Sequence, residues 1–345
     1  MVSCIYIDFL YTLYNFFLMS QKIITGIKST GLSLHIGNLM GAVLPFQRIA
    51  SGKDAAIFVA DLHSLTSVKD GKTLEEQTFE IALEYFAIFG IDTPIRIFRQ
   101  SDIVDITKLM WIIANVTPYS LMLRAHSFKD NEAKNIDINM WVFNYPILMA
   151  ADIIGYDCEA VPVGKDQIQH LEMTRDIVRA FNKTYGQEVF IEPEAMIAEE
   201  VATLPGVDGR KMSKSYDNFI GVFDDEKTLK KRVMSIVSGS EWVDERKKNP
   251  DECNIFNLYR VFASPAQISE LRKKYESENI GFWYGHAKTE LLTVLTKYLR
   301  PYREAREKLL KNPEIVIEKL RLWAIEMNKR LAAKMKIVKE VVGVN

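Results

Sequence analysis

The sequence predicts an α/β fold, in which a doubly wound parallel (Rossmann-like) sheet is followed by an all-helical C-terminal domain. Short apolar runs at residues 23–25, 55–60, 95–98 and 160–163 are typical of buried strands. The segments between them, such as residues 74–89, space their apolar residues as a helix does. Strands that alternate with helices in this way predict a parallel sheet, whose ligands bind beyond the carboxyl ends of the strands.

The second half of the chain predicts helices. Strand patterns fade after residue 224, and Pro313 predicts the first turn of a late helix. Between residues 288 and 340 there are fourteen Lys and Arg against seven Asp and Glu. Such an excess is usually a solvated helix face, but it also suits an RNA-facing surface. We therefore expect a first domain at residues 19–223 and a helical domain at residues 224–345.

Composition excludes several classes of protein. The chain has 345 residues, 48% of them apolar, and a formal net charge of −1, which suits a globular protein and argues against a generic polyanion binder. Its three cysteines, Cys4, Cys158 and Cys253, are far apart. Neither they nor the five histidines have the spacing of metal ligands, so we expect no structural zinc or iron–sulfur cluster and a reducing cytosol.

Residues 1–18 differ from the rest of the chain. They are apolar and aromatic, with Asp8 as the only charge between residues 5 and 18. A signal peptide would need a positively charged start, and a membrane span would need about 20 apolar residues. We interpret the segment as a non-core extension before Met19, with a misassigned start or a peripheral membrane tether as alternatives.

A first motif follows the first strand. Glycines at positions 26 and 31 flank a loop, and a helix is predicted from about Ile36. Glycines let backbone approach a ligand closely, and a helix N-terminus presents free N–H groups to phosphate. His35 and Asn38 add side-chain donors. The alternative is an ordinary strand–turn–helix with a capping histidine.

A second motif is the string Lys-Met-Ser-Lys-Ser at residues 211–215, after a loop that contains Pro205, Gly206 and Gly209. Attack on the α-phosphorus of ATP builds charge on the leaving pyrophosphate. Mobile lysines that reach those oxygens mainly in the transition state stabilise it. Two lysines three residues apart, taken alone, usually indicate a solvated basic loop. The five-residue string is a more specific signal.

The two motifs together, HIGN at residues 35–38 and KMSKS at residues 211–215, resemble the paired signatures of class I aminoacyl-tRNA synthetases. The blocks between them resemble the tryptophanyl-tRNA synthetases, namely residues 60–64, 99–103, 145–153 and 161–170. Asn38 replaces the last histidine of the general motif, as is usual in this branch. Three residues separate Gly31 from His35, where two are expected.

The chemistry of indole agrees with this resemblance. Indole carries one N–H donor and no acceptor, so its pocket needs an acceptor at the end of an apolar slot. Asp152, between apolar neighbours, offers one. A buried carboxylate without a donor is costly, which would exclude phenylalanine by a factor of about 10⁴–10⁵. The alternative is an aspartate that interrupts a core helix and pairs locally.

The resemblance implies which residues are catalytic, which bind tryptophan and which bind ATP. His35, Lys211 and Lys214 would be catalytic. The residues implied to bind tryptophan are Asp152, Tyr145, Met149, Gln167, Val161 and Val163. Those implied to bind ATP are Lys28, Ser29, Thr30, Gly37, Asn38, Lys129, Gly164, Lys165, Asp166, Lys211, Met212, Ser213, Lys214 and Ser215, with Gly164 and Asp166 at the ribose.

The resemblance also implies the reaction and the partners. L-tryptophan would attack ATP to give tryptophanyl-adenylate, Mg²⁺ would accompany the nucleotide, and tRNA(Trp) would accept the aminoacyl group. A cytoplasmic homodimer is implied, with tRNA on the helical domain. Three alternatives stay open: a tyrosyl-tRNA synthetase, a nucleotidyltransferase that makes small adenylates, and a catalytically silent RNA-binding paralogue.

Overall fold

The computed structural model describes residues 21–29, 31, 33–125, 139–164, 167–197, 204–237, 249–277 and 282–344. Its contacts divide the chain into two compact units. The first, here called the sheet unit, comprises Met1–Thr30, Phe46–Glu199 and Pro313–Asn345. The second, here called the helical unit, comprises Gly31–Pro45 and Glu200–Asn312. The expected extension at residues 1–18 lies outside the described residues.

The sheet unit is built on five parallel strands in the order β3-β2-β1-β4-β5. Their bounds are β1 Lys22–Ile27, β2 Asp54–Val59, β3 Arg96–Arg99, β4 Ala160–Val163 and β5 Glu194–Ile197. The expected α/β fold is confirmed, and the four strands expected from apolar runs are present. After β3 the chain returns to the other side of β1, so the switch point lies between β1 and β4. Ligands of doubly wound sheets bind beyond the strand ends at this point.

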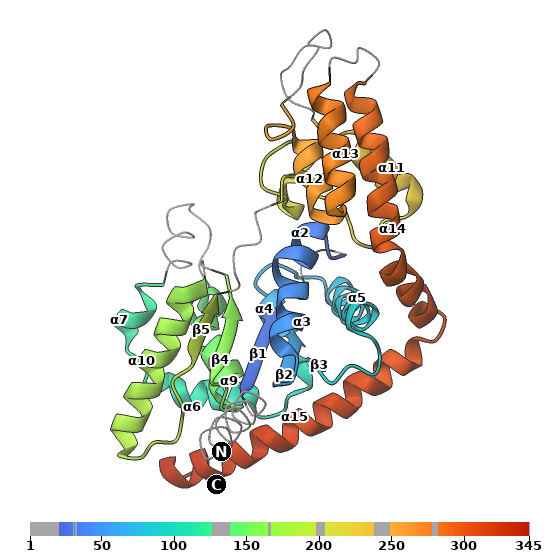
Figure 1. Cartoon of the computed structure of the whole chain (residues 1–345). Coiled ribbons are helices and arrows are strands. Elements are labelled where there is room, and N and C mark those ends of the chain that lie inside the picture. The colour runs from blue at the N-terminus through green and yellow to red at the C-terminus, as the bar shows by residue number, and fades with distance from the viewer. Residues whose placement is uncertain are drawn as a thin grey trace, which may run out of the picture. The chain divides into compact units, whose positions relative to one another are not determined.

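The helices of the sheet unit flank its strands (Figure 1). They are α4 Asp61–Ser64, α5 Gly71–Phe89, α6 Ile106–Ala114, α7 Tyr119–Met122, α9 Met140–Ile154, α10 Ile168–Tyr185 and α15 Pro313–Val342, with a short 3₁₀ turn, η2 Gln100–Asp102. α5 begins before the expected residue 74, because the Asp70 side chain accepts the Thr73 N–H and caps the helix. α9 and α10 pack on each other and cover the region of β4 and β5.

α15 begins at Pro313 as expected and packs along β3 (Figure 1). Its buried side chains Met327, Leu331, Met335 and Val338 join the core of the sheet unit. The late helical region is therefore shared between the two units. The division at residues 223 and 224 into catalytic and tRNA-binding domains stays a prediction about roles.

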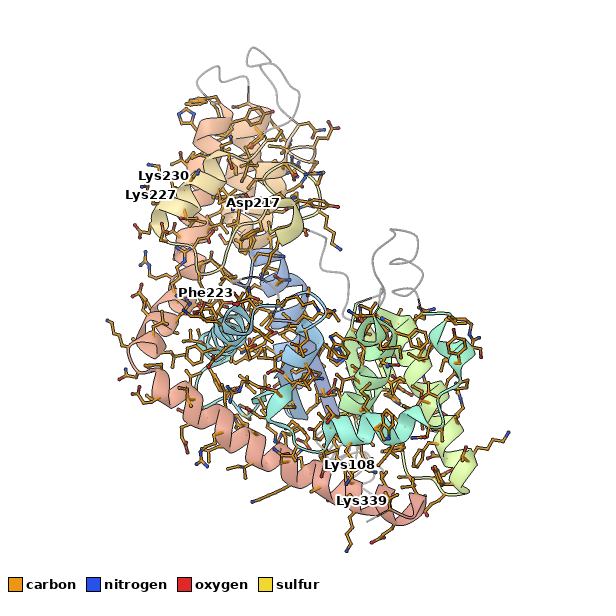
Figure 2. The ribbon with its side chains drawn as sticks, turned by 180° about the vertical axis from the view of Figure 1, so that it is seen from behind. Lys108, Asp217, Phe223, Lys227, Lys230 and Lys339 are labelled. Carbon is orange, nitrogen blue, oxygen red and sulfur yellow. The ribbon has the colours of Figure 1, made fainter. Side chains whose placement is uncertain are left out.

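The helical unit contains α2 Ile36–Asn38, η1 Leu39–Val43, η4 Lys214–Tyr216, α11 Glu226–Met234, α12 Asn254–Phe262, α13 Pro265–Glu276 and α14 Tyr284–Leu310. A further helix, α3 Leu44–Ala50, continues from η1 across the boundary between the units. α14 packs against α11 and α12. Figure 2 labels Lys227 and Lys230 on α11, and both residues are exposed. Within the described ranges, no helix is long and apolar enough to cross a membrane.

Candidate active site

The sheet unit holds a buried carboxylate. Asp152 is 3% exposed on α9, and its Oδ2 receives two hydrogen bonds. His63 Nε2 lies 3.0 Å from this oxygen, and Gln100 Nε2 donates to it at 2.7 Å. Burial raises the pKa of Asp152, while the bonds from His63 and Gln100 oppose that rise. Two side chains therefore hydrogen-bond the carboxylate, as burial of a charge requires.

His63 and Gln100 come from different elements, α4 and η2, which a second buried aspartate ties together. Asp61 accepts the N–H groups of Leu62 at 2.9 Å and Ser101 at 3.0 Å, and it also accepts the Ser101 hydroxyl. Neither His63 nor Gln100 had a role assigned from the sequence, although both lie in blocks that carry the resemblance. Their function as partners of Asp152 depends on a contact across β2 and β3 that no local pattern encodes.

The residues expected to bind tryptophan lie on two elements. Tyr145, Met149 and Asp152 are spaced by four and three residues on α9, which places them on one helix face. Tyr145 packs edge-on against the His63 ring, and its hydroxyl lies 3.1 Å from His170 Nε2. Trp141 stacks on His63 with 5.8 Å between ring centroids, so the carboxylate is bordered by aromatic rings.

The remaining residues expected to bind tryptophan lie in β4 and between β4 and α10. Val161 is buried and Val163 is partly buried, and their spacing places both on one face of the strand. Gln167 precedes α10 and donates its N–H to the Gly164 carbonyl at 2.9 Å. Asp166, expected at the ribose, lies outside the described residues, as do Lys165, Thr30 and Lys129, which were expected to bind ATP. These assignments stay predictions.

The loop after β1 places one cation beside this group. Lys28 Nζ lies 5.5 Å from the centroid of the Tyr145 ring. The next residue, Ser29, is fully buried, and both its N–H and its hydroxyl bond to the Ser64 hydroxyl. The Ser29 side chain therefore bonds within the protein, and its expected contact with ATP stays a prediction.

In the helical unit, His35 and Asn38 cap each other. His35 Nδ1 accepts the Asn38 N–H at 3.1 Å, and Asn38 Oδ1 accepts the His35 N–H at 3.3 Å. Because Nδ1 is an acceptor, the neutral ring carries its proton on Nε2, where it is a donor. A Cβ on Gly37 would lie 2.9 Å from His35 Nδ1, so the ring requires glycine at that position.

The charge of His35 is set by its surroundings. Burial, together with the positive charge of Lys214, lowers the pKa of His35 to about 4. The imidazole is therefore neutral near pH 7 and presents an N–H donor rather than a positive charge.

The segment that carries Lys211 and Lys214, here called the lysine loop, is ordered by Asn218. Sequence reasoning did not identify this side chain. This residue is 2% exposed, and its Oδ1 accepts the Ser213 N–H at 2.8 Å. Its amide donates to Asp208 Oδ1 at 2.8 Å and to the Lys211 carbonyl at 3.1 Å. Asn218 therefore satisfies backbone groups on both sides of Met212. The signal available was an asparagine three residues after the string, which alone predicts nothing.

The two motifs lie together in the helical unit. Ile36 donates its N–H to the Ile220 carbonyl at 2.9 Å, and Val222 donates to the Leu34 carbonyl at 2.9 Å. Gly31, with φ of 82°, lies beside the Lys214 side chain. HIGN and KMSKS are 173 to 180 residues apart in the sequence. These contacts nevertheless bring the neutral N–H donor of His35 close to Lys214 in the fold. Lys211 is exposed and Met212 is buried. Of Ser215 only the backbone is described, in η4.

Among the described residues, no group of three or more His, Cys, Asp and Glu could hold a metal ion. The sheet unit therefore holds a buried acceptor among aromatic rings. The helical unit holds N–H donors and lysines.

Known proteins share this sequence and fold. The family profile described as tRNA synthetases class I (W and Y) matches residues 19–300. The tryptophan–tRNA ligase of Fusobacterium nucleatum is 45% identical over 94% of this chain and 98% of its own length. That of Campylobacter jejuni is 39% identical over 94% of this chain and 100% of its own length. A crystal structure of tryptophanyl-tRNA synthetase from Campylobacter jejuni, complexed with ADP and tryptophan, matches with a TM-score of 0.87 at 38% identity, over 94% of this chain and 100% of that chain.

Proposed function

This chain belongs to the class I tRNA synthetases of the tryptophan and tyrosine family, and we propose that Asp152 is the residue by which it selects its amino acid. The chain activates L-tryptophan with ATP and transfers it to tRNA(Trp). The observation that carries the proposed role of Asp152 is its burial among aromatic rings, with hydrogen bonds from His63 and Gln100 to Oδ2. We assign the indole N–H to Oδ1 of the same carboxylate.

Selection then follows from hydrogen bonding. His63 and Gln100 hold the carboxylate in place, so its second oxygen can meet the indole N–H without rearrangement. Phenylalanine has no donor and would leave the buried acceptor unpaired, which costs a factor of about 10⁴–10⁵ in specificity. Tyr145 and Gln167 receive the ammonium group, and Met149, Val161 and Val163 line the slot.

The chemistry is an in-line attack of the tryptophan carboxylate on the α-phosphorus of ATP. The carboxylate oxygen forms a bond to phosphorus as the bond to pyrophosphate breaks, and no covalent enzyme intermediate is needed. His35 donates its Nε2–H to a phosphate oxygen, and Lys211 and Lys214 stabilise charge on the leaving pyrophosphate. Lys28 neutralises charge on the substrate carboxylate or on the α-phosphate. Mg²⁺ enters with ATP as part of the nucleotide substrate.

A homodimer in the cytoplasm is the proposed working form. In the sheet unit, α6 and α7 both pack on α9. Large apolar side chains on and near these helices are exposed. Val104 is 80% exposed, Trp111 75%, Tyr119 69% and Met140 68%. Monomeric proteins rarely expose such side chains together, and a second copy of this chain is the partner that would cover them.

The test is tryptophan-dependent ATP–pyrophosphate exchange, measured with each of the twenty amino acids. We expect exchange with tryptophan alone, and a loss of at least a hundredfold in kcat/KM for Asp152→Ala, because the indole N–H then lacks its acceptor. Ala82→Gly, at a buried site on α5, is a control for general destabilisation. Preference for tyrosine would overturn the substrate, and absence of exchange with any amino acid would favour a silent paralogue.

A further inference from the structure

Three buried hydroxyls from three elements form one hydrogen-bonded chain in the sheet unit. They are Ser29 after β1, Ser64 at the end of α4 and Thr78 within α5, and they are 0%, 0% and 4% exposed. Thr78 Oγ1 lies 3.2 Å from Ser29 Oγ, which lies 2.9 Å from Ser64 Oγ. Ser64 Oγ lies 2.9 Å from the Ala60 carbonyl. We call these three residues the hydroxyl chain.

The donors of the hydroxyl chain can run in one direction only. The Ala60 carbonyl can only accept, so the Ser64 hydroxyl donates its one hydrogen to it. Ser64 must then accept from the Ser29 hydroxyl, and Ser29 must accept from Thr78. The Ser29 N–H also donates to Ser64 Oγ at 2.9 Å. Every hydroxyl proton in the chain is used, so the arrangement has one satisfied state and resists displacement.

Two members of the hydroxyl chain, Ser29 and Ser64, each follow a residue of the site. Lys28 precedes Ser29 and lies by the Tyr145 ring, while His63 precedes Ser64 and bonds to Asp152. The backbone is tied as well, since Ala60 donates its N–H to the Ile27 carbonyl at 2.8 Å. A shift of Ser29 relative to Ser64 would therefore change the distance between the Lys28 cation and the carboxylate that holds indole.

We propose that the hydroxyl chain is a positioning device, which fixes Lys28 relative to His63 and Asp152 so that one amino acid substrate can meet both. The proposal rests on the function proposed above. Ser29, Ser64 and Thr78 act through Lys28 and are positioning residues. Because Lys28 faces charge that changes as the α-phosphorus is attacked, misplacement should lower kcat more than it raises the KM for tryptophan.

The first test is a double-mutant cycle between Ser64→Ala and Lys28→Ala in tryptophan-dependent exchange. Ser64→Ala removes the acceptor of the Ser29 N–H and hydroxyl, and we expect kcat to fall about tenfold. If the hydroxyl chain acts through Lys28, Ser64→Ala should cost less than threefold once Lys28 is alanine. Multiplicative losses in the double variant would overturn the proposal, because a merely structural serine would act independently of Lys28.

A second series guards against misfolding of Ser64→Ala. Thr78→Val keeps the shape of the side chain and removes its hydroxyl, whereas Thr78→Ser keeps the hydroxyl. We expect kcat to fall about threefold to tenfold for Thr78→Val and to recover for Thr78→Ser. Thr93→Val removes another buried hydroxyl of the same unit, one that accepts the Ile95 N–H, and should leave kcat unchanged.

The outcomes separate this inference from the proposed function. A parent protein without tryptophan-dependent exchange would remove the proposed function. An active parent, in which Thr78→Val and Thr78→Ser have the same kcat as the parent, would remove the hydroxyl chain alone.

Discussion

At the scale of single residues, hydrogen bonds to neighbouring groups hold several of the side chains predicted to form the site. His35 is held by reciprocal bonds with Asn38, and Asp152 by His63 and Gln100. The sequence indicated His35, Asn38 and Asp152, because each stands in a motif or in an apolar run. It did not indicate His63 or Gln100 as partners of Asp152, because hydrogen bonds between α4, η2 and α9 depend on tertiary packing.

The lowered pKa of His35 predicts how stability changes with pH. The folded state holds the pKa at about 4, whereas an unfolded histidine titrates near 6.5, so the unfolded state binds more protons between these values. Stability from this group is lost as pH falls through that window. The free energy of unfolding should rise by about 2 kcal/mol from pH 5 to pH 7 on its account.

Urea unfolding of His35→Asn measures this contribution, because asparagine can cap α2 but does not titrate. The rise between pH 5 and pH 7 should be smaller in the variant than in the parent by about 2 kcal/mol. Equal rises in the two proteins would show that His35 titrates normally in the fold.

At the scale of elements, the strands were predictable where they are apolar and the loops were not. β1 to β4 follow apolar runs, but β5 has the sequence EAMI, which is short and begins with a glutamate. α15 was predicted as a helix, yet its place beside β3 was not. That place is fixed by Arg96 and Arg330, which both pair with Asp54 and Glu326. The pair of Glu326 and Arg330 has helical spacing, but the pairing of these two residues with Asp54 and Arg96 cannot be predicted from spacing.

The lysine loop gives a prediction at this scale. Asn218→Ala removes the bonds to the Ser213 N–H, to Asp208 and to the Lys211 carbonyl. The loop should then sample other conformations, and kcat for exchange should fall at least tenfold, with little change in the KM for tryptophan. Lys211→Ala and Lys214→Ala should show the same pattern, because they remove the charges that Asn218 places.

Asn257→Ala is the matched control for Asn218→Ala. Asn257 lies on α12 of the same unit and donates to the Asp251 carbonyl at 3.2 Å. It should lower the thermal midpoint without lowering kcat. A parent-like kcat for Asn218→Ala would show that the loop does not need this residue.

At the scale of the whole molecule, the proposed dimer gives the third prediction. Trp111→Asp places a charge among the exposed apolar side chains around α6, and sedimentation velocity should show monomers where the parent sediments as a dimer. Trp283→Asp changes a tryptophan that is 59% exposed in the helical unit and should leave the dimer intact. A dimer that survives Trp111→Asp would place the interface on another surface.

The division of the chain into its two units bears on how the protein is made. The sheet unit takes its final helix from Pro313–Asn345, which follows all of Glu200–Asn312 in the other unit. During vectorial synthesis, β1 to β5 therefore leave the ribosome long before α15, which packs against β3. Arg330 and Glu326 can join the pair formed by Arg96 and Asp54 only after they have left the ribosome. Chaperone demand should accordingly peak for nascent chains that end just short of residue 313.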